Sequence, residues 1–129
     1  MIVDTSALLA ILFQEPDAAV FAHAMEVADT RRISAATFLE AAIVVESQTG
    51  EGGGRQFDAL MRNSLVTIEP VTVEQAHVAR QAWADFGKGR HPARLNICDC
   101  FAYALAKVTG EPLLFKGDDF RKTDIHPAL

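Results

Sequence analysis

The 129-residue chain is poor in cysteine, with only Cys98 and Cys100. Residues two positions apart on a helix point in different directions, so we expect these thiols neither to bridge nor to share a metal ion. The sequence predicts two small buried side chains, and nothing in this usage indicates an oxidising compartment. The four histidines also lack a ligating pair such as His-x-x-x-His, which leaves a zinc centre unsupported.

Long apolar runs are missing as well. No stretch approaches the roughly 20 apolar residues that a membrane-spanning helix needs. The chain opens on a strand-like run, so we expect no signal peptide and a cytoplasmic protein. Half of the residues are hydrophobic, which is enough for a packed core, and the length predicts a single domain over residues 1–129.

The chain has no excess of positive charge either: it contains 12 basic and 17 acidic residues, which gives a net charge of −5. This balance argues against a passive nucleic-acid binder, which would usually be basic. An acidic enzyme that binds cations is not excluded, since the bound ions reverse the local field.

Several catalytic motifs are missing. The chain has no Gly-x-Ser-x-Gly for a serine hydrolase, and no Lys-Ser/Thr follows Gly52–Gly54 to make a phosphate-binding loop. A haloacid-dehalogenase phosphohydrolase needs Asp-x-Asp after its first strand, but Ser6 stands in the second place after Asp4.

Short apolar runs and amphipathic segments alternate along the chain, which predicts an α/β fold with a parallel sheet and helices on both faces. A flexible connection is expected at residues 51–55 and a basic loop at 87–94. The expected strands cover residues 1–3, 32–34, 66–68, 112–115 and, as a short last one, 123–125. The expected helices cover residues 7–13, 17–27, 37–49, 55–63, 72–87 and 96–109, with Thr5 or Ser6 as the first cap.

Acidic residues stand where apolar runs meet turns or helix starts: Asp4, Glu40, Asp99 and the pair Asp118 and Asp119. The carboxyl ends of parallel strands share one edge of a sheet, so acids far apart in the sequence can meet there. Carboxylates without histidine or cysteine partners suit a hard cation such as Mg²⁺. This pattern points to metal-assisted phosphodiester chemistry.

Each acid also has a purely structural interpretation. Asp4 suits a helix cap, Glu40 completes a capping box with Thr37, and Asp99 does so with Asn96. The pair at 118–119 suits a solvated turn. A helix that follows a parallel strand starts at the carboxyl edge of the sheet, so capping and catalytic roles place these acids at the same location.

In the motifs that carry these acids, the sequence resembles the PIN-domain ribonucleases, and more closely the VapC toxins of bacterial type II toxin–antitoxin systems. The resemblance covers the whole chain and its motifs occur in family order. They are MIVDTSAL at 1–8, SAATFLEA at 34–41, GKGRH at 87–91 with LNICDCFAYA at 95–104, and PLLFKGDDF at 112–120 with TDI at 123–125.

The resemblance implies a PIN-like fold, with a central parallel sheet of four to five strands flanked by helices on both faces. It implies an endoribonuclease that depends on Mg²⁺ or Mn²⁺, cleaves RNA and thereby inhibits translation. The implied partners are a cognate VapB antitoxin and a second copy in a homodimer, and the implied location is the bacterial cytoplasm.

The resemblance also implies a catalytic quartet of Asp4, Glu40, Asp99 and Asp119, with Asp4 and Asp99 as metal ligands. Asp118 is the alternative to Asp119 at the metal, and Thr5 or Ser6 would orient a ligand water. The residues that would guide the RNA backbone are Lys88, Arg90, His91, Arg94 and Lys116, although a solvated basic loop is the alternative. A PIN-like binding module without catalysis would lack one of the acids, and none is missing.

Overall fold

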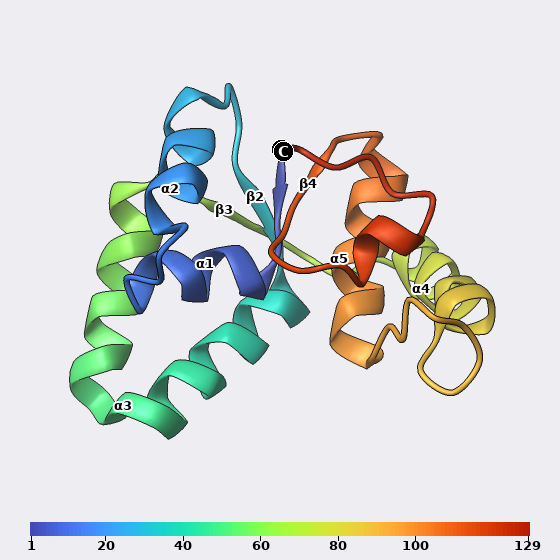
Figure 1. Cartoon of the computed structure of the whole chain (residues 1–129), viewed down its shortest axis with the longest axis horizontal. Coiled ribbons are helices and arrows are strands. Elements are labelled where there is room, and N and C mark those ends of the chain that lie inside the picture. Colours follow the sequence, from blue (N-terminus) through green and yellow to red (C-terminus); the bar gives the residue numbers. More distant parts are fainter.

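The computed structural model describes all 129 residues as an α/β fold around four parallel strands (Figure 1). The strand order is β3-β2-β1-β4, so the first strand of the chain is central. Every neighbouring pair is parallel, which confirms the predicted sheet. The strands are β1 (Ile2–Val3), β2 (Arg32–Ser34), β3 (Thr67–Glu69) and β4 (Leu113–Leu114).

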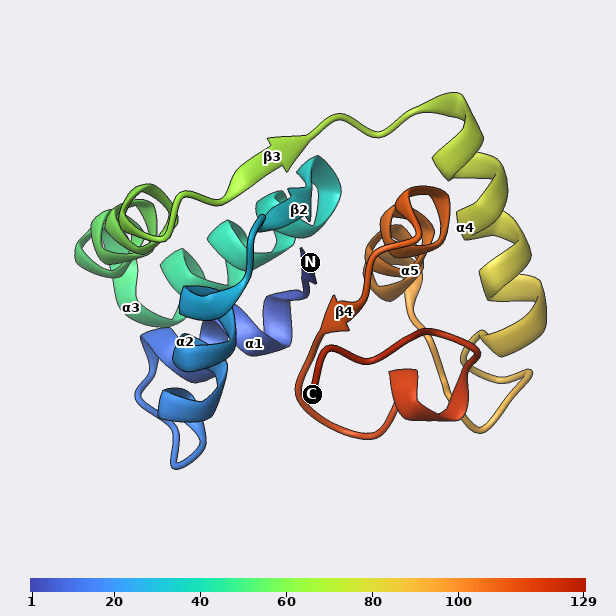
Figure 2. The ribbon, with the colours of Figure 1, turned by 90° about the horizontal axis from the view of Figure 1, so that it is seen from above.

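Five helices cover the sheet on its two sides, as the sequence predicted. Seen from above, α1, α2 and α3 lie on one side, and α4 and α5 pack together on the other (Figure 2). None of the helices is long and apolar enough to cross a lipid bilayer. The helices are α1 (Thr5–Leu12), α2 (Ala18–Val27), α3 (Ala35–Asn63), α4 (Val73–Phe86) and α5 (Ile97–Thr109).

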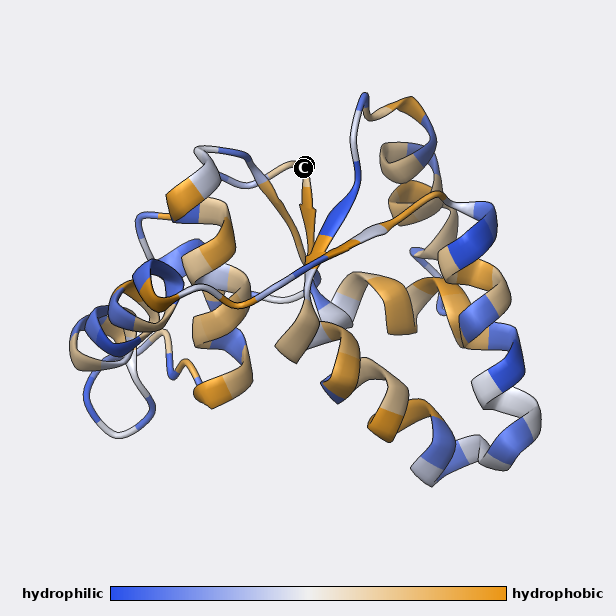
Figure 3. Ribbon diagram, turned by 180° about the vertical axis from the view of Figure 1, so that it is seen from behind, coloured by the Kyte–Doolittle hydropathy of each residue, from blue (hydrophilic) through white to orange (hydrophobic).

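The sheet separates two hydrophobic clusters because successive strand residues point to opposite faces. Ile2 and Leu113 belong to the cluster under α4 and α5, whereas Val3 and Leu114 belong to the one under α1, α2 and α3. All four side chains are fully buried. Figure 3 shows β1 and β4 as hydrophobic and the loop after α4 as hydrophilic.

The glycine-rich segment of α3 differs from the prediction. A break at Gly50 is confirmed, since its φ of 71° and ψ of −164° interrupt the helix. The flexible connection expected at 51–55 is wrong, because these residues are helical. A Cβ on Gly53 would lie 1.6 Å from Thr49 Oγ1, and one on Gly54 would lie 2.7 Å from Glu46 Oε1. The glycines therefore let the two arms of α3 approach each other closely.

The strand expected at 123–125 is also wrong. A 3₁₀ turn (Phe120–Lys122) occupies the preceding residues, and the Thr123 hydroxyl donates to the Phe120 carbonyl at 2.6 Å. Only one isolated parallel bridge, between Leu113 and Pro127, extends the sheet at this edge. Proline has no backbone N–H for a ladder, so the sheet stays at four strands.

A hydrogen bond ties this C-terminal segment to α5. The Tyr103 hydroxyl donates to Asp124 Oδ1 at 2.6 Å, and Lys107 pairs with the other carboxylate oxygen at 3.0 Å. The bond from Tyr103 is the largest cause of a lowered pKa at Asp124. A carboxylate with a lowered pKa stabilises the fold above its unfolded pKa, and this contribution is lost as the pH falls through the folded value.

We expect Tyr103→Phe to lower the free energy of unfolding by about 1 kcal/mol at pH 7, a modest value because Asp124 is exposed. The loss should shrink at pH 3, where Asp124 starts to be protonated. Urea denaturation at the two pH values measures both effects. Equal losses at both would contradict the assigned role of the ionised carboxylate.

Candidate active site

Asp4 lies at the carboxyl end of β1 and caps α1. Its side chain is 5% exposed, and Oδ2 accepts from the backbone N–H of Ser6 at 3.1 Å and from the Ser6 hydroxyl at 2.6 Å. The expectation that Thr5 or Ser6 caps this helix is therefore wrong, because the aspartate does so. Burial raises the pKa of Asp4, while the bonds from Ser6 lower it and the charge of Glu40 raises it further.

Glu40 reaches the same place from α3. The Thr5 hydroxyl donates to Glu40 Oε1 at 2.6 Å. The capping box predicted for Glu40 and Thr37 is wrong, because Ser34 caps this helix and Ala35 begins it. Glu40 consequently lies beyond the first turn, where its carboxylate is not needed for a cap and faces Thr5 instead.

Asp99 is both a capping residue and a member of the acidic edge. Asn96 Oδ1 accepts from the Asp99 N–H at 2.8 Å, and Asp99 Oδ2 accepts from the Asn96 N–H at 2.9 Å, which confirms the predicted capping box. Burial raises the pKa of Asp99 to about 7 against the opposing Asn96 bond. The charges of Asp4, Glu40 and Asp119 add to this rise, so the four predicted acids lie within electrostatic reach of one another.

The two aspartates after β4 have different surroundings. Asp119 precedes the 3₁₀ turn, makes no capping bond there, and its charge acts on Asp99. Asp118 instead lines a separate hollow together with Asp17 and Arg121. Both side chains are exposed. Of the two, Asp119 is the one that shares the edge with Asp99.

Cys98 belongs to this site although sequence reasoning did not place it there. Its thiol is only partly buried and lies close enough to Glu40 to feel its charge, whereas Cys100 is 3% exposed as predicted. The prediction of a buried apolar role is therefore wrong for Cys98. Burial and the neighbouring carboxylates, Glu40 first among them, raise the pKa of Cys98 to about 12. It therefore stays a neutral thiol beside Glu40, and its one signal in the sequence is its place next to Asp99.

Lys116, one of the predicted RNA-guiding residues, is engaged elsewhere. Its ammonium pairs with Glu15 and, at 2.9 Å, with Asp17. The hydrogen bonds that Lys116 donates to these two carboxylates raise its pKa. Its backbone N–H donates to the Ser6 hydroxyl oxygen at 2.9 Å, which ties the turn after β4 to the start of α1.

The basic loop at 87–94 is ordered. The N–H of Lys88 donates to the Leu95 carbonyl at 2.9 Å, and the N–H of Leu95 donates to the Phe86 carbonyl at 3.0 Å. Ala93 and Leu95 are fully buried and anchor the loop in the core. The loop leads directly into the cap of α5 and therefore ends beside Asp99.

The cationic side chains of this loop point outward. Lys88, Arg90 and Arg94 are exposed and take part in none of the salt bridges of the chain. His91 instead helps to form the loop, since its Nδ1 accepts from the Ala93 N–H at 3.0 Å and its ring meets Phe86 edge-on. Three of the predicted RNA-guiding residues are thus available to an anionic ligand near the acids.

The acidic edge offers hard oxygen donors that suit Mg²⁺. In this side-chain arrangement no three acidic, histidine or cysteine side chains converge closely enough to enclose a metal ion. Mg²⁺ commonly binds through one or two carboxylates and keeps several waters, so the donor set fits it without a third direct ligand. The mutual repulsion that raises the pKa of Asp99 also favours a cation here.

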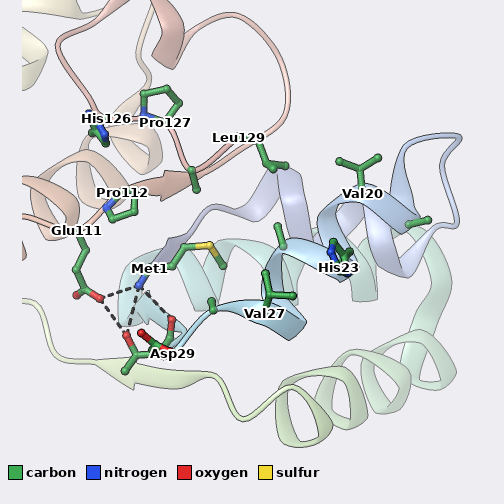
Figure 4. Close-up of a pocket in the computed structure, with 15 residues that line it drawn as sticks. Met1, Val20, His23, Val27, Asp29, Glu111, Pro112, His126, Pro127 and Leu129 are labelled. Carbon is green, nitrogen blue, oxygen red and sulfur yellow. Dashed lines mark hydrogen bonds and ion pairs between the residues drawn. The ribbon is translucent and has the colours of Figure 1, made fainter.

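A pocket of about 960 Å³ lies away from these acids, and none of them lines it. It surrounds Met1, which precedes β1 and so marks the opposite edge of the sheet (Figure 4). There the Met1 ammonium donates to Glu111 Oε1 at 2.7 Å and to the Thr30 carbonyl at 3.1 Å. Size alone does not identify the candidate active site in this protein.

A four-stranded parallel sheet with acids gathered at its carboxyl edge defines an α/β protein of the PIN type. A family model described as the PIN domain matches residues 1–126. Ribonuclease VapC30 of Mycobacterium tuberculosis is 50% identical over 97% of this chain and 95% of its own length. Ribonuclease VapC of Mycolicibacterium smegmatis is 52% identical over 97% of this chain and 97% of its own length. The chain belongs to the PIN-domain family and, within it, to the VapC group, as its motifs predicted.

Solved structures show the same fold at low sequence identity. The VapC20 toxin of M. tuberculosis, described as cleaving the sarcin–ricin loop, superposes with a TM-score of 0.75 at 18% identity, covering 96% of this chain and 95% of its own. A chain in a toxin–antitoxin complex from Klebsiella pneumoniae superposes with a TM-score of 0.69 at 19% sequence identity. The match covers 95% of this chain and 92% of the Klebsiella chain. At these identities the likeness concerns the fold.

Proposed function

We propose that this chain is a Mg²⁺-dependent endoribonuclease toxin of a VapBC pair. The observation that carries the proposal is the position of Asp99, whose pKa is raised by burial and by the charges of Asp4, Glu40 and Asp119. Four acids from distant parts of the chain thus act on one place at the carboxyl edge of the sheet. Relatives that are half identical over nearly their whole length are named ribonucleases, which supports RNA as the substrate.

The residues take distinct roles in this proposal. Asp4 and Asp99 hold the divalent cation, Mg²⁺ or Mn²⁺, and Asp119 completes the quartet, with Asp118 as the alternative. When bound, the cation supplies an acidified water and neutralises the charge that develops at phosphorus and at the leaving oxygen. Glu40, held by the Thr5 hydroxyl, would orient the attacking water or accept its proton.

Other groups set the positions of these acids. The Ser6 hydroxyl donates to Asp4 and so fixes the direction of its carboxylate. Cys98 brings a neutral thiol close to Glu40 from the side of α5. The exposed cations Lys88, Arg90 and Arg94 would neutralise backbone phosphates of the RNA.

The proposed partner, location and oligomeric state are those expected of the VapC group. A cognate VapB antitoxin would neutralise the toxin, and the Klebsiella structure, itself a toxin–antitoxin complex on this fold, supports such a partner. We place the toxin in the bacterial cytoplasm, as one PIN domain over residues 1–129 that forms a homodimer and inhibits translation.

A cleavage assay tests the proposal. Structured RNA should be cut in Mg²⁺ or Mn²⁺, remain intact in EDTA, and be cut again when Mg²⁺ is restored in excess. Cleavage that resists EDTA would contradict the metal-dependent mechanism. Turnover of a small phosphomonoester with intact RNA would indicate a phosphohydrolase, and no turnover of either would indicate a binding module.

A further inference from the structure

The strand β3 forms an open edge of the sheet. It pairs only with β2, because the strand order is β3-β2-β1-β4. In Figure 2 it runs along the outer border of the molecule, between the end of α3 and the start of α4, with no helix beyond it. The opposite edge differs, since β4 is extended there by the bridge between Leu113 and Pro127. β3 is therefore the edge at which another strand can continue the sheet.

The backbone of Ile68, in the middle of β3, faces away from the sheet. The N–H of Thr67 donates to the Arg31 carbonyl at 2.9 Å, so Thr67 directs its backbone groups toward β2. Successive residues of a strand direct these groups to opposite sides, and Ile68 consequently directs its own N–H and C=O outward. An edge with an unpaired donor and acceptor is a template for pairing with another chain.

Large apolar side chains surround this edge. Ile68 is 44% exposed, Leu65 is 73% exposed and Val71 is 38% exposed, with Val73 beyond them at 77%. Exposed apolar groups beside an unpaired edge favour association. Pro70 keeps the edge short, because a residue without an N–H cannot donate to a longer ladder. The surface thus suits one short strand with apolar neighbours of its own.

The sequence around β3 is symmetric about Ile68. Leu65 and Val71 stand three residues from it on opposite sides. Two antiparallel copies that pair at Ile68 would exchange both of its backbone hydrogen bonds, as directly opposed residues of an antiparallel ladder do. The same pairing would bring Leu65 of one copy toward Val71 of the other. Apolar side chains would therefore meet apolar side chains on both sides of the centre.

The charges near β3 also fit a two-fold pairing. Thr67 would lie opposite Glu69 of the other copy, whose carboxylate already pairs with Arg32 of its own chain at 3.8 Å. Farther out, Arg62 and Glu74 stand six residues to either side of the centre, at the end of α3 and the start of α4. Both are exposed, and neither takes part in a salt bridge within the chain. Antiparallel copies would bring these opposite charges to the same side of the contact.

We propose that two copies of the chain associate through β3, antiparallel and centred on Ile68, so that their sheets become continuous. A stable interface buries on the order of 1,000 Å² or more, so the flanking apolar side chains take part as well as the strand. A two-fold contact occupies the same edge in both copies and therefore closes at a dimer. The inference rests on the homodimer of the proposed function and deepens it by naming the surface.

Charge substitutions at the centre of the contact test the proposal on the full chain. Ile68→Lys and Ile68→Glu should each raise the dissociation constant of the dimer roughly tenfold or more, because like charges would meet at the two-fold axis. An equimolar mixture of the two variants should dimerise again, since lysine would then face glutamate. Analytical ultracentrifugation over a range of protein concentrations measures all three. A mixture that stays as weak as either variant would overturn the pairing about Ile68.

Ile43→Lys is the matched control. Ile43 is 56% exposed and lies in the arm of α3 before the break at Gly50, so the same charge enters a comparable apolar surface on another element. The dimer should persist in this variant, and circular dichroism should show that every variant keeps its helices. A dimer that Ile43→Lys abolishes and Ile68→Lys leaves intact would refute β3 and assign the interface to α3.

An extended segment of another protein is the rival occupant of the edge. If a co-expressed VapB antitoxin neutralises the unsubstituted toxin but not Ile68→Lys, while both toxins still dimerise, the edge belongs to the antitoxin and the proposal fails.

RNA cleavage per chain is scored separately and should be unchanged in Ile68→Lys, which lies outside the acidic edge. A monomeric unsubstituted protein would refute the homodimer and the β3 contact together, while its cleavage of RNA would leave the nuclease proposal standing. A dimer that Ile68→Lys does not weaken would refute the β3 contact alone.

Discussion

Replacing Asp99 with asparagine is expected to reduce RNA cleavage by roughly 100-fold or more, because the cation loses a charged ligand. The fold should survive, since the asparagine oxygen can still accept from the Asn96 N–H that Asp99 binds at 2.9 Å. Cleavage of a structured RNA in Mg²⁺ measures the first effect, and circular dichroism measures the second. Binding of the antitoxin should be retained.

The same substitution makes a prediction about stability that distinguishes a catalytic from a structural role. The folded pKa of Asp99 is about 7, above its unfolded value, so the ionised carboxylate destabilises the metal-free fold progressively as the pH rises between those values. Asp99→Asn should therefore melt above the unsubstituted protein at pH 8 without metal. Asp58→Asn, an exposed aspartate on α3, serves as the control. Full cleavage by Asp99→Asn would refute the assignment.

Mg²⁺ is expected to raise the melting temperature of the protein, because it binds the folded acidic edge and not the unfolded chain. At ten times the dissociation constant, binding adds about 1.4 kcal/mol, which is about 5 °C for a domain of this size. Thermal denaturation with increasing Mg²⁺ measures the shift.

Two comparisons make the Mg²⁺ experiment specific. NaCl at equal ionic strength should give a much smaller shift, since it screens charges without binding. Asp99→Asn should lose most of the shift. A melting temperature of the unsubstituted protein that stays constant at millimolar Mg²⁺ would argue against a formed, occupied site.

The capping residues show which parts of the site can be predicted from neighbouring residues in the sequence. Asn96 and Asp99 were predicted as a pair, and the structure contains both of their bonds, because a capping box depends only on residues within one turn. The capping box predicted from the same pattern at Thr37 and Glu40 does not form. Ser34, at the end of β2, starts α3 earlier, and that choice depends on where the strand ends in the sheet.

Contacts between distant segments explain the other differences. Gly53 and Gly54 look like a flexible connection in sequence, but the segment is helical, and their missing side chains leave room for Thr49 and Glu46. Cys98 was predicted correctly to point away from Cys100. No feature of the neighbouring sequence, however, indicates that Glu40, which belongs to α3, lies close to its thiol. The parallel sheet and the two-sided packing were predictable because the alternation of apolar runs extends along the whole chain, whereas the strand order was not predicted.

The Ser6 hydroxyl has a consequence for how the acids move. Its proton is committed to Asp4 at 2.6 Å, and its oxygen accepts from the Lys116 N–H at 2.9 Å, in the turn that leads to Asp119. A displacement of that turn must break this bond or drag Asp4 with it. The acids from the two ends of the chain are therefore mechanically coupled through one uncharged group, and this coupling is insensitive to ionic strength, unlike one made by a salt bridge.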